Sequence, residues 1–276
     1  MSYKSAEFDF RGEHYGLVFE EAGTACSHAI YSSDIGGYSG NNAIVSMATR
    51  FPSLQFVFFT DSLIKTSLSN LTIVHVKWKG ADERLIAKYF KVNSAKLFPK
   101  TLTQTLWVDS NVELFDHHII NKVSSTELSL FCHDKRNNIT QEIKDIIKHG
   151  KDSEKYMKST INFLANQAQD LDRLQLYQGR IIFRKRAHSV AHFEELWWQY
   201  ILSTTYRDQI SLPVAVDISG VNLIALDPVL RDDYFVVYAH KKYQFRTLGG
   251  GYGTRIRFFI SRIRFRISNF RRRLFK

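Results

Sequence analysis

The 276-residue sequence predicts an α/β domain with a mostly parallel sheet. Two observations support this class. The first is that apolar runs of strand length alternate with segments whose apolar residues recur at helical spacing. The second is that in two of these runs, residues 54–61 and 105–115, a continuous apolar stretch meets an acid, which is typical of strands buried on both faces of a parallel sheet. Ligands of such sheets bind beyond the carboxyl ends of the strands. Polar residues at those ends are therefore the candidates for a site.

The elements follow one another from about residue 25. Residues 1–22 are polar with scattered aromatic residues, and we expect them to pack on the body as a lead-in segment. Apolar runs predict strands at residues 25–31, 54–61, 71–76, 105–115, 128–132, 177–184 and 233–240. Helical spacing predicts helices at residues 43–50, 81–98, 141–168 with an interruption near Gly150, 187–203 and 207–213.

The composition indicates a globular protein. Hydrophobic residues make up 44% of the chain, and its two cysteines form no CxxC pair, which suits a reducing cytosol. The first residues do not resemble a signal peptide, and no apolar run approaches the ~18 residues of a membrane-spanning helix. We therefore expect a soluble or peripheral protein.

The net charge of +11 lies mainly in the last 22 residues, which contain eight arginines, one lysine and no acid. The preceding 254 residues are nearly neutral, with 29 basic and 27 acidic side chains. Residues 255–276 also carry seven large apolar residues at helical spacing, which favours an amphipathic helix on anionic lipid over a strand or a nucleic-acid-binding segment. We divide the chain into one domain (residues 1–246), a glycine-rich linker (residues 247–254) and this basic tail.

The most informative stretch is the polar island Asp109-Ser110-Asn111 within the apolar run at residues 105–115. In an extended chain residues i and i+2 point the same way, so Asp109 and Asn111 could converge on one cation while Ser110 faces elsewhere. Oxygen ligands of this kind suit Mn²⁺ or Mg²⁺. His240, at the end of the last predicted strand, is a candidate third ligand. The alternative is an ordinary Asx turn after a strand, with His240 a surface residue.

Two further polar groups follow predicted strands. A turn rich in glycine and asparagine occupies residues 32–42, and Asp61 ends the next strand. The carboxyl ends of parallel strands meet at one edge of the sheet. These groups and the polar island are therefore expected on one rim.

A predicted helix carries Arg84, Lys88 and Lys91 at positions i, i+4 and i+7, so they share one face. A solvated basic face is the usual reason for such a pattern. The alternative is a clamp for phosphate, which the nearby anion-binding features favour.

Two later segments hold charged candidates. His133, Arg136 and Glu142 follow the strand at residues 128–132 and could line a sugar or phosphate pocket, or form an ordinary surface turn. Asp208 opens a short helix, where an acid is explained by the helix dipole alone. The functional alternative makes Asp208 a catalytic or sugar-binding carboxylate.

With these stretches assembled, the chain resembles the plant mucilage-related glycosyltransferase-like domain family, which also occurs in bacterial polysaccharide loci. The resemblance covers roughly residues 25–240 and implies a nucleotide-sugar-type (GT-A) fold, in which Asp109-Ser-Asn111 stands at the metal-binding Asp-x-Asp with Asn in place of the second acid. The matching segments are Ile30-Tyr-Ser-Ser-Asp-Ile-Gly-Gly-Tyr38, Phe59-Thr-Asp61, Arg84-Leu-Ile-Ala-Lys-Tyr-Phe-Lys91, Leu106-Trp-Val-Asp-Ser-Asn-Val112, His133-Asp-Lys-Arg136 with Glu142, Trp197-Trp198 and Arg207-Asp-Gln-Ile-Ser211.

The same resemblance implies roles for individual residues. Asp208 would lie at the sugar or the acceptor, as the base that deprotonates an acceptor hydroxyl if the reaction inverts. The remaining assignments are Tyr31, Asp34 and Asp61 at the nucleotide base and ribose; Arg84, Lys88 and Lys91 at the diphosphate; Asp109, Asn111 and His240 at the metal; and His133, Arg136, Glu142, Arg207 and Gln209 at the sugar or acceptor.

These observations predict a hexosyltransferase-like enzyme that moves a sugar from a nucleotide-sugar donor to a glycan or lipid-linked acceptor in cell-surface polysaccharide synthesis, such as capsule or O-antigen. We expect it in the cytoplasm, held at the inner membrane face by the basic tail, with Mn²⁺ or Mg²⁺ as cofactor and without nucleic acid as a partner. One alternative is a non-catalytic sugar- or lipid-binding protein on a transferase fold, which the Asn at position 111 supports. A nucleic-acid-associated protein is a third hypothesis, supported only by the tail.

Overall fold

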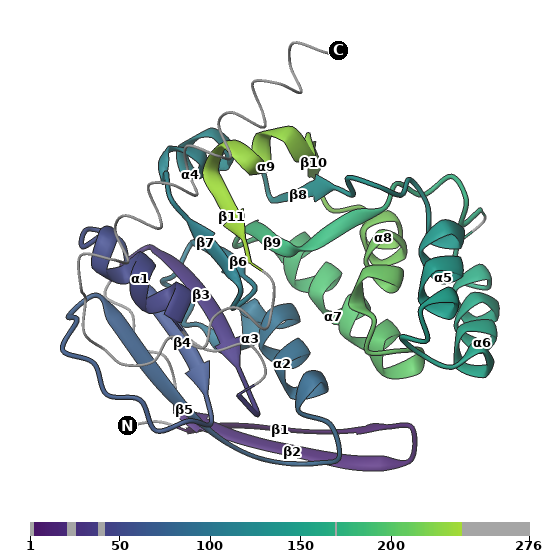
Figure 1. The fold of residues 1–276 in the computed structure, drawn as a ribbon, viewed down its shortest axis with the longest axis horizontal. Helices are drawn as coiled ribbons and strands as arrows, with labels where there is room; N and C mark the ends of the chain where they lie inside the picture. Colours follow the sequence, from purple (N-terminus) through teal and green to yellow (C-terminus); the bar gives the residue numbers. More distant parts are fainter. Residues whose placement is uncertain (1–2, 21–25, 38–41, 169, 239–276) are drawn as a thin grey trace. The chain divides into compact units, whose positions relative to one another are not determined.

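The computed structural model describes residues 3–20, 26–37, 42–168 and 170–238. In this part of the chain a nine-stranded sheet has the strand order β1-β2-β5-β4-β3-β6-β9-β8-β10 (Figure 1). Its centre is parallel: β3 (His28–Asp34) pairs with both β4 (Phe56–Thr60) and β6 (Gln104–Val108), and β4 pairs with β5 (Leu71–Lys79). The predicted class, a mostly parallel sheet flanked by helices, is confirmed.

The other half of the sheet contains an inverted strand. β9 (Tyr177–Lys185) runs antiparallel to both β6 and β8 (Leu128–Cys132), and β10 (Leu223–Leu226) pairs parallel with β8. The start of β9 therefore lies at the same edge as the carboxyl ends of β3, β6 and β8. Side chains from all four strands can meet at that edge.

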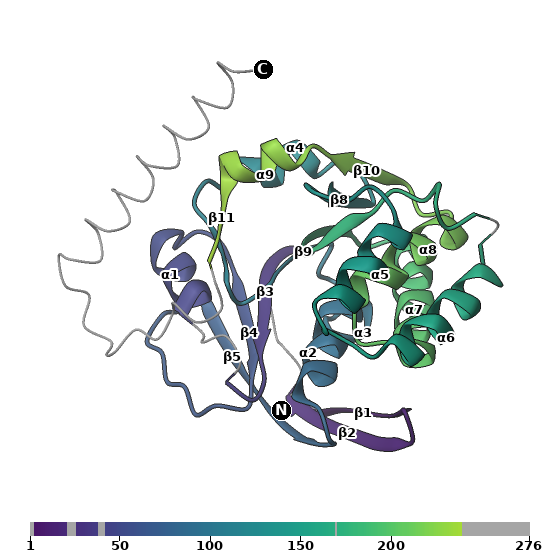
Figure 2. The same cartoon turned by 45° about the vertical axis from the view of Figure 1, so that its right-hand side comes forward.

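Helices cover both faces of the sheet (Figure 2). One core contains residues of α2, α3, α5, α6, α7 and α8, and the other contains residues of α1, α4 and α9. Along β4, Val57 and Phe59 enter the first core and Phe56 and Phe58 the second, because successive side chains of a strand alternate between faces. Each of these fully buried side chains contributes roughly 1.5–3 kcal/mol by leaving water. The helices are α1 (Asn42–Arg50), α2 (Glu83–Val92), α3 (Ser94–Leu97), α4 (His118–Val123), α5 (Ile139–Lys148), α6 (Glu154–Ala165), α7 (His188–Ser203), α8 (Asp208–Ser219) and α9 (Pro228–Tyr234).

The predicted strand at residues 105–115 is interrupted. The amide of Val112 donates to the carbonyl oxygen of Asp109 at 2.8 Å, which closes a turn over residues 109–111. After the turn, β7 (Val112–Leu114) leaves the main sheet and pairs antiparallel with β11 (Phe235–Val237). One strand over residues 105–115 is therefore wrong, and the structure has the alternative, a strand followed by a turn. Asp and Asn favour a turn here even though apolar residues continue beyond it.

The lead-in segment is also more regular than predicted. β1 (Tyr3–Phe10) and β2 (Glu13–Glu20) form an antiparallel hairpin, and β2 extends the main sheet by pairing with β5. The turn residues Arg11 and Gly12 adopt φ values of 53° and 84°. In β2 the large buried side chains, those of Tyr15, Leu17 and Phe19, recur at every second position, a period of two that indicates a strand with one face on the core.

Near the carboxyl end, residues 233–240 were predicted as one strand. In the structure α9 continues to Tyr234, and β11 begins at Phe235. Two residues in the sequence favour the start of helix α9 here. Pro228 lies in its first turn, and the side chain of Asp227 caps it by accepting from the amide of Val229 at 2.7 Å. The predicted linker, the basic tail and His240 lie outside the described residues.

Within the described ranges, no helix combines the length and apolar character needed to cross a membrane.

Candidate active site

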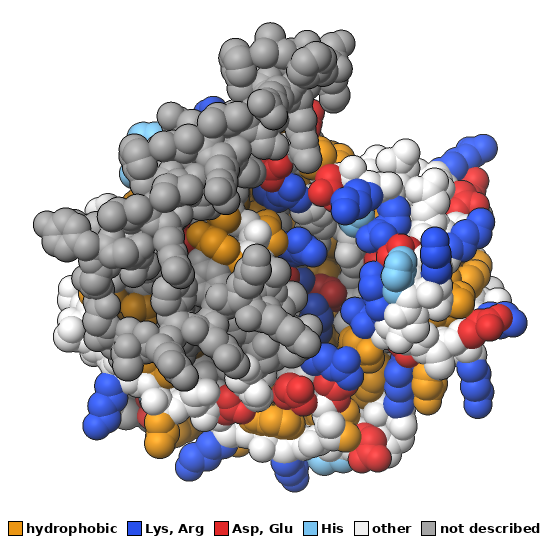
Figure 3. All heavy atoms as spheres, viewed as in Figure 1, with side chains coloured by type: hydrophobic (Ala, Val, Ile, Leu, Met, Phe, Trp, Pro, Cys, Tyr) orange, Lys and Arg blue, Asp and Glu red, His pale blue; other side chains and the backbone are white. Residues whose placement is uncertain are grey.

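A charged cavity of about 210 Å³ lies at the carboxyl ends of β3 and β6, beside α2. Its lining carries four basic and three acidic side chains. Figure 3 shows Lys and Arg side chains gathered in the middle of this face, with acidic groups among them. The described residues that line the cavity are Ser33, Asp34, Ile35, Arg84, Ala87, Lys88, Lys91, Trp107, Asp109, Ser110, Tyr206, Arg207 and Asp208.

Helix α2 presents its basic face to this cavity. The side chain of Asp82 caps the helix by accepting from the amide of Arg84 at 2.9 Å. Leu85, Ile86 and Phe90 are buried in the core on the opposite side of the helix. The predicted common face of Arg84, Lys88 and Lys91 is confirmed, since all three line the cavity.

The acids and lysines in the cavity form a chain of ion pairs. Asp208 contacts Lys88 Nζ through Oδ1 at 2.9 Å and Lys91 Nζ through Oδ2 at 2.7 Å. Lys91 Nζ also lies 3.3 Å from Asp109 Oδ1, and only 3% of the Lys91 side chain is exposed. The chain therefore runs Lys88, Asp208, Lys91, Asp109. We call these four residues the ion-pair chain.

The charges in this chain set the pKa values of Asp208 and Lys91, whereas at Lys88 burial outweighs Asp208 and lowers the pKa. Burial alone raises the pKa of Asp208, but Lys88 and Lys91 outweigh it and hold that pKa well below its ordinary value. Burial alone lowers the pKa of Lys91, and the facing Asp109 and Asp208 carboxylates outweigh it, so the pKa is raised. Asp208 is consequently a carboxylate and Lys91 an ammonium ion at neutral pH.

The backbone of strand β9 passes close to the ion-pair chain at Gly179. A Cβ atom at Gly179 would lie 3.1 Å from both Asp208 Oδ2 and Lys91 Nζ. Only a glycine lets the backbone run this close without displacing them. The sequence shows a glycine in this predicted strand, but it does not predict the contact that requires one, because Lys91, Gly179 and Asp208 are far apart along the chain.

Asp109 and Asn111, the two predicted metal ligands that the structure describes, do not converge on one point. Asp109 lines the cavity, but its Oδ1 atom accepts from Trp107 Nε1 at 2.9 Å and also faces Lys91. Asn111 is 3% exposed, and its Nδ2 atom donates to the carbonyl oxygen of Tyr238 at 2.6 Å. The turn at residues 109–111 explains this separation, because it brings Ser110 rather than Asn111 to the cavity.

The remaining donors do not complete a metal site either. Asn111 Oδ1 is buried without a hydrogen-bond partner among the described residues, but Asn111 does not line the cavity. His240 lies outside the described ranges. Over those ranges, no three His, Cys, Asp or Glu side chains are grouped so that they could hold a metal ion. The described donor set therefore does not fit a divalent cation, because the Lys91 ammonium already lies between the Asp109 and Asp208 carboxylates.

The residues predicted at the nucleotide base and ribose are dispersed. Asp34 lines the cavity and is 5% exposed. Asp61 instead accepts from the amide of Gly36 at 3.0 Å and from Trp78 Nε1 at 2.9 Å, which ties the loop after β3 to β5. Tyr31 has no exposed surface and lies in the core, so the predicted contact of Tyr31 with a nucleotide is wrong.

Three of the residues predicted at the sugar or acceptor form a second network between the loop after β8 and α5. Arg136 pairs with Glu142 at 2.5 Å and with Asp145 at 2.8 Å, and His133 Nε2 lies 3.1 Å from Arg136 Nη2. This network is separate from the lining of the charged cavity. Of the other two predicted residues, Arg207 lines the cavity, whereas Gln209 on α8 does not.

Tyr206 is a cavity residue that the sequence did not single out. Arg84 stacks over its ring in a cation–π contact, with the guanidinium carbon 4.4 Å from the ring centroid. Its hydroxyl group donates to the carbonyl oxygen of Lys151 at 3.1 Å. The only local signal was an aromatic residue beside Arg207-Asp208.

The comparison with protein families identifies the domain. Residues 61–225, more than half of the chain, match the family described as TOD1/MUCI70, glycosyltransferase-like domain. The chain belongs to this family. The predicted resemblance is thereby confirmed, and the matched range contains the whole ion-pair chain and Gly179. No curated protein matches the sequence.

Two solved structures show distant similarity to this member of the TOD1/MUCI70 family. One is the galactosyltransferase LgtC in complex with donor and acceptor sugar analogs, with 8% identity, a TM-score of 0.42 and coverage of 72% of each chain. The other is a glycosyltransferase involved in the glycosylation of the major capsid of PBCV-1, with 12% identity, a TM-score of 0.42 and coverage of 77% of this chain and 96% of that one.

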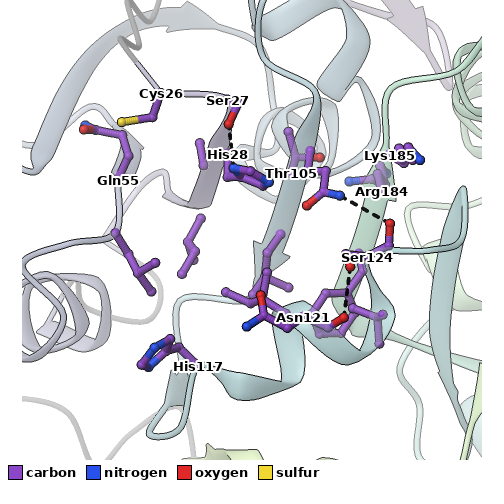
Figure 4. Close-up of a pocket in the computed structure, with 18 of the residues that line it drawn as sticks. Cys26, Ser27, His28, Gln55, Thr105, His117, Asn121, Ser124, Arg184 and Lys185 are labelled. Atoms are coloured by element: carbon purple, nitrogen blue, oxygen red, sulfur yellow. Dashed lines mark hydrogen bonds between the residues drawn. The ribbon is translucent and has the colours of Figure 1, made fainter.

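The glycosyltransferase-like domain has a larger cavity, of about 720 Å³, at the opposite edge of the sheet (Figure 4). It is lined by the amino ends of β3 and β6 and by α4. Its hydrogen-bonding groups are mainly uncharged, such as His28, Gln104 and Asn121, and its described lining contains no Asp or Glu. A diphosphate requires several positive charges, so the smaller charged cavity is the better candidate for the active site.

Proposed function

We propose that this protein is a glycosyltransferase that moves a hexosyl group from a nucleotide-sugar donor to a glycan or lipid-linked acceptor in cell-surface polysaccharide synthesis. The proposal is supported by one observation above all. In a glycosyltransferase-like domain, the charged cavity at the carboxyl ends of β3 and β6 presents Arg84, Lys88, Lys91 and Arg207 together. This is the place where ligands of parallel sheets bind, and these are the charges that a diphosphate requires.

The reaction explains why positive charge is needed. The bond between the anomeric carbon and the donor's diphosphate oxygen breaks, and a bond from the acceptor hydroxyl oxygen to that carbon forms. The proton of that hydroxyl passes to the departing diphosphate or to water. Negative charge develops on the departing diphosphate, and fixed positive groups beside it lower the barrier. Arg84, Lys88 and Lys91 on one face of α2 are placed for this role.

The geometry changes the role that the sequence suggested for Asp208. A general base works best when its pKa lies near the working pH. Lys88 and Lys91 hold the pKa of Asp208 far below that range, which makes this carboxylate a weak proton acceptor. We therefore propose that Asp208 is a positioning residue, which holds the two lysine ammonium groups in place.

The function is tested by incubating the full chain with a panel of UDP- and GDP-hexoses and measuring release of the nucleoside diphosphate. We expect release from at least one donor, and a Lys88→Ala variant to lower kcat/KM about tenfold to a hundredfold. Lys96→Ala, a change at an exposed lysine of α3, is the matched control. Absence of release from every donor, with or without added glycan, would contradict the proposal.

A second candidate function is non-catalytic binding of a sugar or nucleotide. The observation that favours it is the ion pairing of Asp208, because the predicted catalytic base is held as a weak one. Binding of a nucleoside diphosphate without turnover of any donor would support this alternative.

We also propose that residues 255–276 hold the protein at anionic membrane, at the cytoplasmic face. The support is the sequence alone: eight arginines and one lysine interleaved with large apolar residues. If the acceptor is membrane-bound, the tail would bring the enzyme to the surface that carries it.

A further inference from the structure

The ammonium group of Lys91 occupies an unusual position. It lies 3.3 Å from Asp109 Oδ1 and 2.7 Å from Asp208 Oδ2, so it bridges two carboxylates from distant parts of the chain. Proteins commonly hold a divalent cation between two carboxylates. Here the Lys91 ammonium group stands in the place that such a cation would take.

The structure holds Lys91 there firmly. Its backbone carbonyl oxygen accepts from Arg184 Nη2 at 2.9 Å and from the hydroxyl group of Tyr31 at 3.4 Å. Arg184 is itself buried and paired with Glu194 at 3.0 Å. The end of α2 is therefore anchored by buried polar groups, and the Lys91 side chain reaches the cavity from a fixed point.

The space around the ammonium group is equally restricted. Gly179 brings the backbone of β9 so close that a Cβ atom would lie 3.1 Å from Lys91 Nζ. The amide of Asp109 donates to the carbonyl oxygen of Arg180 on the same strand at 2.9 Å, which fixes the Asp109 backbone. A divalent cation bound by Asp109 and Asp208 would have to displace this ammonium group or share the site with it. Sharing is unfavourable, because like charges repel strongly where water is excluded.

We propose that the Lys91 ammonium group replaces the divalent cation at this site, so that a nucleoside diphosphate binds the charged cavity without a metal ion. The inference rests on the proposed function and specifies how that site neutralises its ligand. Lys91 supplies a permanent positive charge, Asp109 and Asp208 hold it in place, and the basic groups of Arg84, Lys88 and Arg207 surround it.

The arrangement also predicts the effect of removing the charge. In Lys91→Met the side chain keeps a similar length, but Asp109 and Asp208 are left facing each other without their shared cation. Such a pair of carboxylates is a ligand set for Mn²⁺. The variant should therefore acquire the metal dependence that the native protein lacks.

The test is calorimetric titration of the full chain, stripped of metal by dialysis, with UDP and with GDP, in EDTA and in Mn²⁺. For the native protein we expect the same dissociation constant in both buffers, to within about twofold. For Lys91→Met we expect binding in EDTA to weaken about tenfold to a hundredfold and to recover in part with Mn²⁺. Lys96→Met is the matched control and should behave like the native chain.

The outcomes separate the inference from the proposed function. Native binding that disappears in EDTA and returns with Mn²⁺ would overturn the inference and leave the proposed function standing. Absence of UDP and GDP binding in both buffers would contradict the nucleotide site itself. If circular dichroism shows that Lys91→Met does not fold, Lys91→Gln replaces it. The inference predicts the same weakening of binding in EDTA for this variant, and binding in EDTA equal to that of the native chain would overturn it.

Discussion

Individual residues in the charged cavity carry roles that depend on their partners. Asp208 illustrates this point, since an acid at the start of a helix can be a dipole partner, a base or a counter-ion. Its contacts with Lys88 at 2.9 Å and Lys91 at 2.7 Å favour the counter-ion. Tyr31 likewise lies in a segment that resembles a nucleotide site, yet it is buried and supports the backbone of Lys91.

The role of Asp208 leads to the first prediction. Asp208→Asn removes the partner of two lysines in a largely buried site, so we expect the free energy of unfolding to fall by about 2 kcal/mol. Since no proton passes through Asp208, kcat should fall by less than about tenfold. Urea unfolding and steady-state kinetics measure the two effects. A loss of kcat of about a thousandfold in a folded variant would restore Asp208 as the base.

His133 gives a prediction for pH. Its Nδ1 atom accepts from the amides of Lys135 and Arg136, at 3.1 and 3.0 Å, so this atom cannot carry a proton in the folded state. Burial, with the positive charge of Arg136, lowers the pKa of His133 from 6.5 to about 4. The unfolded chain thus binds a proton at a higher pH than the folded chain does, and stability is lost as pH falls from about 6.5 towards 4.

We expect this loss to reach up to about 3 kcal/mol, because each unit of pKa difference is worth about 1.4 kcal/mol. The measurement is urea unfolding at a series of pH values for the native chain and for His133→Gln, which cannot titrate. The variant should show a shallower fall in stability over this range. His192→Gln, at an exposed histidine of α7, is the control. Equal slopes for the native chain and His133→Gln would refute the assignment.

At the scale of elements, β9 links the sheet to the site. Its start lies beside the carboxyl ends of the parallel strands because it runs antiparallel to β6 and β8. Gly179 on this strand does not adopt a positive φ, so an alanine there is compatible with the backbone, and only the neighbours of the added methyl group matter. Those neighbours are Asp208 and Lys91.

We therefore expect Gly179→Ala to weaken nucleoside diphosphate binding about fivefold, since a shift of a few tenths of an ångström in the ion-pair chain costs about 1 kcal/mol. Fluorescence or calorimetric titration with UDP or GDP measures the effect. Gly16→Ala on β2 is a matched control, because its new Cβ atom would meet the flexible side chain of Lys79 away from the cavity. Equal affinities for the two variants would show that the close approach of β9 does not matter.

The elements also show what the sequence could predict. β4, β8, α1 and α7 were predicted to within a few residues, because their apolar spacing alone specifies a buried strand or a helix face. The turn between β6 and β7 was predicted only as an alternative, and the pairing of β7 in another sheet was missed, since Val112 and Leu114 continue the apolar pattern. The basic face of α2 followed from helical periodicity. The ion-pair chain did not, because Lys91, Asp109 and Asp208 come together only through tertiary folding.

At the scale of the whole molecule, the charge separates two regions. The 254 residues that precede the tail carry a net charge of +2, and both lysines of the charged cavity form ion pairs with Asp208. The tail carries +9 without an acid. Electrostatic attraction to an anionic surface should therefore depend on the tail, whereas binding of a nucleotide should not.

Deleting residues 255–276 tests this division. We expect the truncated chain to stop sedimenting with vesicles that contain anionic phospholipid, because each basic residue near such a surface contributes about 1 kcal/mol of attraction. The native chain should sediment with these vesicles at low salt, less at high salt, and little with neutral vesicles, since mobile ions screen the attraction. Affinity for UDP or GDP should be unchanged by the deletion. Retained vesicle binding in the truncated chain would place the membrane contact on the body of the protein, whereas loss of nucleotide binding would show that the tail contributes to the site.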